Sequence, residues 1–554
     1  AGTSAAGARC LPVKPFLALL SHSWDKMGTP FVREGGFVRI KQIMFGLISI
    51  ALAVVLAVIV LRLVFPLPDI SGREPQNAIA ADPATQLGRL LQAGEAAHPG
   101  KTGVLPLADG KDALASRLAL IEHAQSSIDA QYYIWHDDTS GILLLAALRE
   151  AAARGVRVRL LLDDNGVPGL DAHMASLNAL PNFHIRLFNP STVRRPKLLG
   201  YTFDFFRMNR RMHNKSFIVD GAAAIVGGRN IGDEYFQIGE AFYVDMDVLA
   251  TGAILPETAA VFDEYWNSAS VYGVEKIIPG SGDLQAFEAR VAQVRSSEEA
   301  HAVLAELESS AERYAGGGEA LEWTDVQLVA DDPVKGEGIA TRDQLMIMRL
   351  GAILGEARER LDLISAYFVP GKIGSSYFSD LAKAGRQVRI LTNALNTTDV
   401  LLVHSGYAKY RRGLLEAGVK LYELKLRGGV TQGSEIQLKP FGLSGASLHA
   451  KTFAVDGERI FIGSFNFDPR SAILNCEMGF LIDSENMARK VSEGFDESLG
   501  LVSYQPRLTP ENKMVWVEER RQQDPVIYQE EPGATWFQQV ATVVAGWLPV
   551  EWLL

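Results

Sequence analysis

The sequence predicts an α/β protein made of two similar halves that follow one N-terminal membrane helix. Three observations lead to this prediction. A run of nineteen uncharged apolar residues, Ile43 to Leu61, is long enough to cross a bilayer. Beyond it, segments with the periodicity of helices and of strands alternate along the chain. A motif of histidine, lysine, aspartate, glycine and asparagine then occurs twice with the same spacing.

The apolar run IMFGLISIALAVVLAVIVL is predicted to be an uncleaved membrane anchor. Arg33, Arg39 and Lys41 precede it and Arg62 follows it, and a basic excess on the N-terminal side favours a cytoplasmic N-terminus. A cleaved signal peptide is the alternative, because AIA at 78–80 has the form of a cleavage site. That site lies far beyond the run, and the run is longer than a usual signal core. We therefore favour the anchor.

Two units of the same plan are expected after the anchor. KDALASRLALIEHAQSSIDAQYYIW and ILLLAALREAAARGVRVRLLLDD each indicate a helix that leads into a strand, and DQLMIMRLGAILGEARERLDLISAYF and FSDLAKAGRQVRILTN repeat this plan. Asp129 and Asp362 are 233 residues apart and the two motif histidines are 236 apart, so the halves are nearly in register. The predicted segments are an N-terminal flank without a fold of its own (1–42), a transmembrane helix (43–64), a linker (65–100), a first repeat (101–280), a connecting helix and linker (281–320), a second repeat (321–505) and a C-terminal extension (506–554).

The first copy of the motif lies in a predicted β-hairpin, RMHNKSFIVDGAAAIVGGRN at residues 211–230. Asp220 and Gly221 form a strong two-residue turn signal between apolar runs. Counted back from such a turn, His213 pairs with Gly228, and this glycine leaves room beside the imidazole. We therefore expect Asp220 to be a turn residue with a structural role.

The same hairpin gathers groups that suit a phosphoryl oxyanion. Because side chains alternate along a strand, His213 and Lys215 share one face. Asn230 lies just beyond the second strand, near the same end. A nucleophile or base, a fixed cation and an amide donor can together bind and attack a phosphate. On one copy alone, a half-buried hairpin with an incidental histidine explains the pattern equally well.

A second copy makes chance a poor explanation. LHAKTFAVDGERIFIGSFN at residues 448–466 repeats all five fixed positions. They are His449, Lys451, Asp456, Gly463 and Asn466. Asp456 is expected to be structural, like its counterpart in the first copy.

The spacing H-x-K-x4-D-x6-G-x2-N, complete in both copies, resembles the phospholipase D superfamily. LLDDNGVPGLDAHMASL, HIRLFNP, NRRMHNKSFIVDG, VGGRNIGDEYF and the ending LPVEWLL further resemble bacterial cardiolipin synthases, particularly the C-type branch. The resemblance spans the chain from the first repeat to its end. It implies two phospholipase D-like α/β sandwich repeats packed about a pseudo-twofold axis, with both motif histidines in one shared cleft.

The resemblance also implies double displacement at phosphorus. Such a reaction needs a nucleophile and a proton donor on opposite sides of the phosphorus. The family most often assigns the nucleophile to the first motif, here His213, with His449 as general acid, although the sequence alone leaves this choice open. The groups expected to bind the phosphate oxygens are Lys215, Lys451, Asn230 and Asn466.

A neutral imidazole needs an acceptor on its other nitrogen to fix the tautomer. By resemblance, Asp245 in FYVDMDVLATG orients His213, and Glu477 in NCEMGF orients His449. Asp247 shares a strand face with Asp245 and competes for the same role. A solvated strand face is the alternative for both aspartates.

Three more positions have open interpretations. Ser464 stands where Gly228 stands in the first copy, and it either donates to the phosphate or is a plain turn serine. His136 and His404 have no partner in a motif and are expected to be ordinary polar positions.

Composition narrows the functional classes. The 554 residues are 47% apolar and 21% charged, which is ordinary for a globular protein, and the net charge of −11 argues against nucleic acid as a partner. The cysteines, Cys10 and Cys476, are far apart and indicate neither a disulfide framework nor a cysteine metal site. Since the sequence has no HExxH or CxxC pattern and the lysines supply fixed positive charge, we predict that neither a metal nor another cofactor is needed.

Two segments are candidates for contact with lipid. VRRPKLLGYTFDFFRMNRR at 193–211 mixes basic and aromatic residues, which suits an anionic membrane surface, and a solvated loop is the alternative. TWFQQVATVVAGWLPVEWLL at 535–554 carries three tryptophans on an apolar segment, which suits an interfacial helix, and packing on the core is the alternative.

The leading functional interpretation is a membrane-anchored phosphatidyltransferase. It would make cardiolipin from phosphatidylglycerol and a second phospholipid, either phosphatidylethanolamine or another phosphatidylglycerol, through a phosphatidyl-histidine intermediate. A phospholipase D with water as acceptor is the alternative, and a nuclease is disfavoured by the acidic charge and the anchor. The expected location is the bacterial inner membrane, with the catalytic halves in the periplasm.

Overall fold

The computed structural model describes residues 34–239, 242–305, 320–398, 400–425, 446–547 and 551–553. It divides into two units, Ala1–Val64 and Phe65–Leu554. The predicted flank before residue 34, with Cys10, lies outside the described residues.

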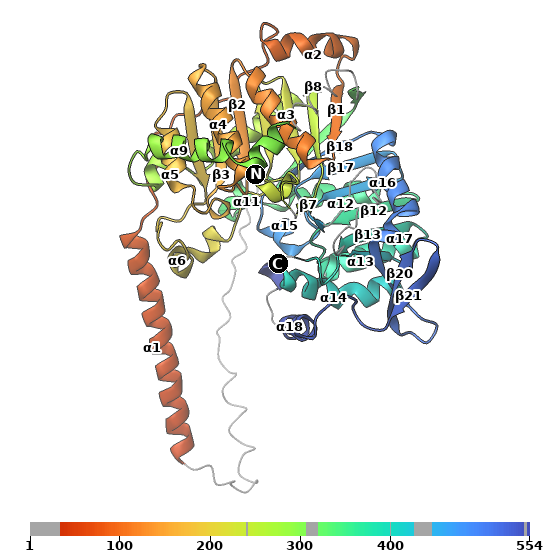
Figure 1. The fold of residues 1–554 in the computed structure, drawn as a ribbon. Helices are drawn as coiled ribbons and strands as arrows, with labels where there is room; N and C mark the ends of the chain where they lie inside the picture. Colours follow the sequence, from red (N-terminus) through yellow and green to blue (C-terminus); the bar gives the residue numbers. More distant parts are fainter. Residues whose placement is uncertain are drawn as a thin grey trace, which may run out of the picture. The chain divides into compact units, whose positions relative to one another are not determined.

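The described part of the first unit is one helix, α1 (Glu34–Val64), drawn in red in Figure 1. Within it, Gln42–Val64 is 23 residues long and apolar enough to cross a membrane. The expected transmembrane helix is therefore present as a helix of sufficient length.

The second unit contains two large mixed sheets. The first sheet has nine strands in the order β10-β1-β8-β6-β5-β2-β3-β4-β9. They are β1 (Thr102–Leu107), β2 (Ser127–Tyr132), β3 (Arg157–Asp163), β4 (Phe183–Phe188), β5 (Ser216–Val219), β6 (Ala223–Gly227), β8 (Asp247–Gly252), β9 (Val271–Gly273) and β10 (Glu322–Thr324). β2, β3 and β4 run parallel to one another, and the motif hairpin β5–β6 joins them antiparallel.

The second sheet has ten strands in the order β11-β18-β17-β16-β12-β13-β14-β19-β20-β21. They are β11 (Val326–Ala330), β12 (Arg360–Ser365), β13 (Gln387–Asn393), β14 (Lys420–Leu424), β16 (Lys451–Val455), β17 (Arg459–Gly463), β18 (Met478–Ile482), β19 (Ser503–Leu508), β20 (Met514–Arg520) and β21 (Gln523–Tyr528). The order β18-β17-β16-β12-β13-β14 repeats the order β8-β6-β5-β2-β3-β4 of the first sheet. The predicted α/β duplication is confirmed.

A buried ion pair marks the same place in each repeat. Arg159 on β3 binds Asp129 on β2 through Nε and Nη2, at 2.6 and 2.8 Å. Arg389 on β13 binds Asp362 on β12 through the same two atoms, at 2.5 and 2.8 Å. The two aspartates that aligned the halves in the sequence therefore have equivalent positions in the fold.

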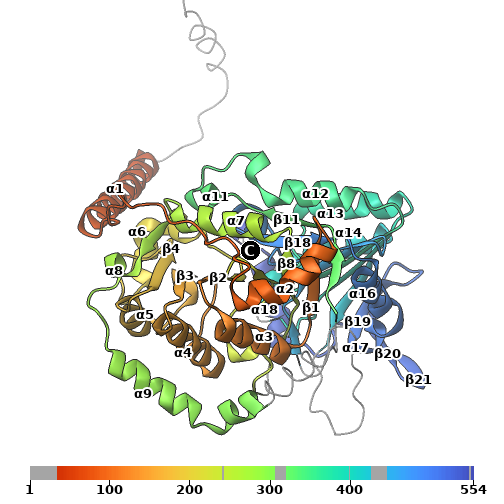
Figure 2. The same cartoon turned by 90° about the horizontal axis from the view of Figure 1, so that it is seen from above.

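Helices cover the outer face of each sheet (Figure 2). On the first sheet they are α3 (Gly110–His123), α4 (Thr139–Ala153), α5 (Asp171–Asn178) and α9 (Leu284–Arg295), with α8 (Val274–Ile277) at the edge. On the second sheet they are α12 (Met346–Gly355), α13 (Gly371–Lys383) and α14 (Leu401–Glu416). Each set encloses an apolar core of its own.

A third core lies between the two halves. It includes Ile218 and Val226 of the first motif hairpin and Ala454 and Ile462 of the second. Helices α7 (Leu255–Asn267), α16 (Glu485–Glu497) and α17 (Leu499–Val502) also contribute to it. Because β6 contacts β17 and β18 directly, the two hairpins face one another within one body.

The stretch expected as a linker, 65–100, packs on this body. The guanidinium of Arg73 donates to the carbonyls of Val271, Asn267 and Ser268. The short helix α2 (Gln86–Ala97) follows and buries Leu87. Polar and proline-rich composition indicated a loop, but it could not show that the loop is held by side chains far along the chain.

The remaining elements connect these layers or extend them. They are α6 (Leu198–Met208), β7 (Phe242–Val244), α11 (Val334–Glu337), β15 (Ala446–Leu448), α15 (Pro469–Ile473), α18 (Trp536–Gly546) and the short 3₁₀ turns at Asp164–Gly166, Asp233–Tyr235, Arg342–Gln344 and Glu551–Leu553. Much of the predicted connection between the repeats (306–319) and part of the ending LPVEWLL (548–550 and 554) lie outside the described residues.

Candidate active site

A short parallel pairing brings the second motif to the first half. β15, which ends just before His449, pairs with β7, which ends just before Asp245. The backbone N–H of His449 donates to the carbonyl of Val244 at 2.8 Å. The histidine of the second half therefore enters the site beside a strand of the first half.

The first motif makes the reciprocal contact. Met212 forms a parallel bridge with Cys476, and the N–H of His213 donates to the carbonyl of Cys476 at 2.8 Å. Cys476 directly precedes Glu477. Each histidine is thus placed next to the carboxylate of the opposite half.

The side chains of the histidines and carboxylates also make contacts between the two halves. Nδ1 of His213 lies 2.8 Å from Oε2 of Glu477, and Nδ1 of His449 lies 2.5 Å from Oδ2 of Asp245. All four residues are buried. The sequence-based pairing of Asp245 with His213 and of Glu477 with His449 was wrong. Each carboxylate follows its own motif along the chain, but the parallel contacts between the halves deliver it to the other histidine.

A carboxylate on Nδ1 fixes the tautomer of each imidazole. It holds the proton on Nδ1 and leaves the lone pair of the neutral ring on Nε2. The competing aspartate, Asp247, does not contact either histidine in this way. It forms buried ion pairs with Arg117 at 2.8 Å and Arg229 at 3.6 Å, so its carboxylate supports the fold below the site.

The two lysines of the motifs lie against their own histidines. Nζ of Lys215 donates to the carbonyl of His213 at 2.5 Å. Nζ of Lys451 donates to the carbonyl of His449 and also lies 2.9 Å from its Nδ1. Both ammonium groups are buried with the imidazoles, which concentrates positive charge where an anionic phosphate would bind.

Burial and these lysines keep both imidazoles from gaining a proton easily. Desolvation and then Lys215 hold the pKa of His213 well below its usual range. Desolvation and Lys451 also lower the pKa of His449, but Asp245 acts in the opposite direction. The protonated form is therefore supported more strongly at His449 than at His213.

The pKa values of the two carboxylates also differ, and this difference again favours the protonated form at His449. Burial alone would raise the pKa of Asp245, but His449 and Lys451 outweigh it and bring the value to about 2. For Glu477, burial prevails over Lys215 and the pKa is raised. Asp245 is thus a firmly ionised partner for His449.

The motif asparagines have different surroundings. Oδ1 of Asn230 accepts from the N–H of Ile134 at 3.1 Å, and its Nδ2 donates to the hydroxyl of Tyr235 at 3.0 Å. Asn466 is equally buried, and within the described part of the chain its Oδ1 has no hydrogen-bond partner. The first amide therefore supports the loop beside the site, and the second has capacity left for a ligand.

Gly228 and Ser464 both serve the carboxylates. A Cβ on Gly228 would lie 2.1 Å from Oδ1 of Asp245, so this glycine makes room for the carboxylate and not for the imidazole as expected. The hydroxyl of Ser464 donates to Oε2 of Glu477 at 2.5 Å and accepts from the N–H of Met478 at 3.0 Å. The hydroxyl proton of the serine is directed at Glu477, so Ser464 is more than a plain turn residue, and its donation to a phosphate stays a prediction.

The motif aspartates lie in turns. In the first hairpin Val219 pairs with Ala223, so the turn has three residues and the ladder is shifted by one from the expected register. Asp220 has a φ of 52° and accepts from the N–H groups of Gln125, Ser126 and Ser127. Asp456, with a φ of 56°, accepts from three consecutive N–H groups in the second half, those of residues 358–360.

Replacing Asp220 with asparagine should therefore destabilise the fold and spare the chemistry. Asparagine tolerates the positive φ, but it loses the charge and one acceptor oxygen. We expect about 2 kcal/mol less stability, measured as a lower melting temperature of the full chain, with unchanged turnover per folded molecule. Asp456→Asn is the matched control, and its effect should be smaller because Asp456 is half-buried whereas Asp220 is buried. A well-folded Asp220→Asn protein without turnover would contradict this assignment.

Aromatic rings around the histidines were not anticipated from the sequence. The ring of Tyr133 packs edge-on against His213 with centroids 5.1 Å apart, and Nζ of Lys215 lies 5.7 Å from the centroid of the same ring. Tyr235 and Tyr243 each lie 5.2 Å from His449. For Tyr133 the available signal was the run QYYIW, which was taken only as part of a strand.

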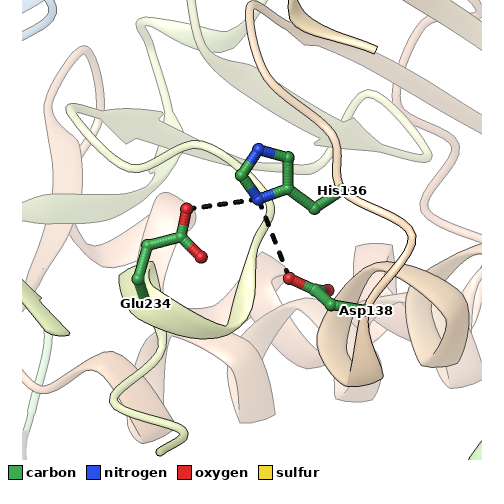
Figure 3. A group of neighbouring side chains, drawn as sticks. All are labelled: His136, Asp138 and Glu234. Carbon is green, nitrogen blue, oxygen red and sulfur yellow. Dashed lines mark ion pairs between the residues drawn. The ribbon is translucent and has the colours of Figure 1, made fainter. Parts of the chain in front are cut away.

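His136, expected to be an ordinary polar position, forms a cluster with two carboxylates near the site (Figure 3). Its Nδ1 lies 3.2 Å from Glu234 and 3.8 Å from Asp138. This is a donor set that could hold a metal ion. However, Asp138 already caps α4 by accepting from Gly141 at 2.9 Å and also accepts from the N–H of Asp233 at 2.8 Å. The hydrogen bond to Glu234 raises the pKa of His136, which favours the protonated imidazole in this cluster.

His404, the other histidine without a motif partner, is buried on α14. Its Nε2 lies 3.1 Å from Oε1 of Glu531, and this contact helps to fix the C-terminal extension to the second repeat.

Comparison with known proteins identifies the class. A family model described as "Cardiolipin synthase, PLD-like domain" matches twice, at residues 118–266 and 350–499. These two matches contain both motif hairpins and both orienting carboxylates. The chain therefore belongs to the phospholipase D superfamily, in the cardiolipin synthase branch.

Individual relatives are similar over most of the chain. Cardiolipin synthase C of Escherichia coli is 45% identical over 464 residues, which cover 82% of this chain and 97% of that protein. An uncharacterised Helicobacter pylori protein is 32% identical over 444 residues, 78% of this chain and 87% of its own length. A phosphatidylserine synthase from Haemophilus influenzae shares the fold, with a TM-score of 0.54, 15% identity and coverage of 85% of this chain and 100% of its own. The chain is a phosphatidyltransferase of the phospholipase D type.

Proposed function

We propose that the protein is a cardiolipin synthase that moves a phosphatidyl group from a donor phospholipid to the terminal hydroxyl of phosphatidylglycerol. The observation that carries the proposal is the pair of buried histidines, each held through Nδ1 by a carboxylate of the opposite half. The similarity to the Escherichia coli enzyme supports the choice of product. With phosphatidylglycerol as donor the released alcohol is glycerol, and with phosphatidylethanolamine it is ethanolamine.

The first step forms a phosphatidyl-histidine. Nε2 of neutral His213 attacks phosphorus, the bond from phosphorus to the headgroup oxygen breaks, and His449 gives its Nε2 proton to the departing alkoxide. In the second step the hydroxyl of phosphatidylglycerol passes its proton to His449 and attacks phosphorus, and the bond from phosphorus to nitrogen breaks. The number of phosphodiester bonds is conserved, so no nucleotide is needed.

The electrostatics of the site support this division of roles. A nucleophile must be neutral, and burial with Lys215 disfavours the protonated form of His213. A general acid must carry a proton, and the ionised Asp245 favours that form of His449. Lys215, Lys451 and Asn466 are the groups best placed to bind the phosphate oxygens.

Since the lysines supply the positive charge that a metal ion supplies in other phosphoryl-transfer sites, chelators should leave turnover unchanged. The measurement is cardiolipin formation in vesicles with and without EDTA, with magnesium added back as the control. Loss of activity in EDTA that a divalent ion restores would contradict the expectation.

The function is tested by lipid profiling of a bacterial host that lacks its own cardiolipin synthases. Expression of the full chain should produce cardiolipin, and a His213→Ala variant should not. Formation of phosphatidic acid without cardiolipin would instead support the alternative, a phospholipase D that uses water as acceptor. Purified enzyme with isotope-labelled phosphatidylglycerol or phosphatidylethanolamine then identifies the donor.

For the location we propose the bacterial inner membrane, with α1 as an uncleaved anchor and the second unit in the periplasm. The support is the 23-residue apolar helix and the basic residues that precede it. Protease added to cells with a permeabilised outer membrane should digest the region after Ala80 while a cytoplasmic marker stays intact. Full protection of that region would place the active site in the cytoplasm.

A further inference from the structure

Helix α18 exposes large apolar side chains and buries a polar one. Trp536, Phe537, Val543 and Val544 are 76, 73, 58 and 49% exposed, whereas Thr542 is buried. The buried side packs on α14, where the hydroxyl of Ser405 donates to the backbone carbonyl of Thr542. A helix in water normally turns its apolar stripe inward. In addition, Trp536–Gly546 contains no charged residue.

Helix α6, in the first half, also exposes large apolar side chains. Leu198, Leu199 and Phe206 are 75, 38 and 68% exposed, and Phe205 is 36% exposed. Asp204 kinks the helix between the first pair of residues and the second. The segments on both sides of the kink expose large apolar side chains, and these four residues are called the α6 stripe. Leucine and phenylalanine on one stripe and tryptophan, phenylalanine and valine on the other are the residues of interfacial helices.

Both stripes belong to one end of the second unit. Arg470 of α15 donates to Oδ1 and to the backbone carbonyl of Asn209, which caps α6, and to the carbonyl of Leu553 in the turn that follows α18. Ile473, also on α15, is 59% exposed. Figure 1 shows α6 and α18 toward the same lower end of the body.

The chain enters the body at this same place. Val64 ends the helix that can span a membrane, and the next residue, Phe65, is fixed to α6. The ring of Phe65 stacks on Phe203 with centroids 6.0 Å apart, and its carbonyl accepts from the hydroxyl of Thr192 at 3.0 Å. Val64, the last residue of this apolar helix, is therefore bonded directly to a residue that contacts α6.

The motif residues of the active site lie close in sequence to α6 and α15. α6 ends at Met208, five residues before His213, and α15 lies between Asn466 and Glu477 in the second motif. A lipid whose headgroup reaches the histidines must keep its acyl chains in an apolar phase. The two stripes offer that phase a contact surface.

We propose that α6 and α18, with Ile473 of α15 and Trp552 of the final turn, form one face that inserts into the lipid bilayer around the exit of α1. The face holds the catalytic histidines over the headgroup layer, so substrate enters from the membrane without crossing water. This inference deepens the proposed function and rests on the phospholipid substrate assigned there. The occupant of the face is the bilayer itself, because the membrane helix joins the body at α6.

The test is site-directed spin labelling of the full chain in vesicles of phosphatidylglycerol and phosphatidylethanolamine. Nitroxides are attached at Phe206→Cys on α6 and at Val543→Cys on α18, in a Cys10→Ser background where Cys476 stays buried. Lys490→Cys, exposed on the polar side of α16, is the matched control. Collision with oxygen reports a lipid environment, and collision with a water-soluble nickel complex, equilibrated across the vesicles by freeze–thaw, reports water.

The labels on α6 and α18 should collide with the nickel complex several-fold less than the label on α16, and more often with oxygen. Equal access of the nickel complex at all three positions would overturn the proposal. Spin–spin broadening at α6 and α18 that disappears on dilution with unlabelled protein would also overturn it, because a second copy of the chain would then cover the face. The readout does not use turnover, so a protein that inserts this face but makes no cardiolipin would refute the proposed function alone.

Discussion

Replacing His213 or His449 with alanine should reduce phosphatidyl transfer by about 10⁴-fold or more in each case. One imidazole forms the covalent intermediate and the other moves the proton, so neither step proceeds without its partner. The double variant should be no worse than either single variant, because the two residues act as one unit. The measurement is cardiolipin formation by purified protein in vesicles.

His184→Ala is the control for this experiment, because His184 is exposed on β4 and has no part in the proposed site. It should keep full activity. The roles can be separated with a donor that carries a good leaving group. Such a donor should partly rescue His449→Ala, which lacks the acid, but not His213→Ala, which lacks the nucleophile. Near-full activity of either single alanine variant would refute the shared site.

Asp245→Asn should reduce kcat by about 10³-fold and move one limb of the pH profile. The carboxylate of Asp245 raises the pKa of His449 against burial and Lys451. Without the charge, the pKa of His449 falls further, and the general acid is protonated only at lower pH. The alkaline limb of kcat/KM should therefore shift to lower pH, while the acid limb, set by His213, stays in place.

Glu477→Gln is the matched variant for the crossed pairing. It touches His213 and not His449, so it should leave the alkaline limb where it is. If Glu477→Gln moved the alkaline limb and Asp245→Asn moved the acid limb, each carboxylate would serve the histidine of its own half, and the crossed arrangement would be refuted.

The sequence was sufficient for the elements that local patterns define. The apolar run, the helix–strand units and the two hairpins follow from periodicity and turn residues, and each occurs where the pattern placed it. The turn at Asp220 shows the limit of this reasoning. An Asp-Gly pair signals a turn, but whether the turn takes two residues or three depends on contacts of Asp220 with residues 125–127, nearly a hundred positions earlier.

The pairing of histidines with carboxylates could not be obtained from the sequence. Proximity along the chain connects His213 with Asp245, whereas β7 and β15 bring Asp245 to His449 from the other half. Ser464 illustrates the same difficulty, since its role depends on Glu477, which reaches it only in the folded sheet. In each case the deciding contact joins residues whose sequence positions carry no signal for one another.

Each half contributes a carboxylate that contacts the histidine of the other half, so the single chain is arranged like a symmetric dimer. In a twofold interface, residue i of one subunit contacts residue j of the other, and j contacts i in return. Here the two halves are covalently linked, and their carboxylates differ, with aspartate in the first half and glutamate in the second. In the proposed mechanism neither repeat by itself carries a complete catalytic unit. A chimera that takes one repeat from a relative must therefore also match the carboxylate that this repeat contributes to the other histidine. Substitutions in the two halves are therefore expected to be correlated during evolution.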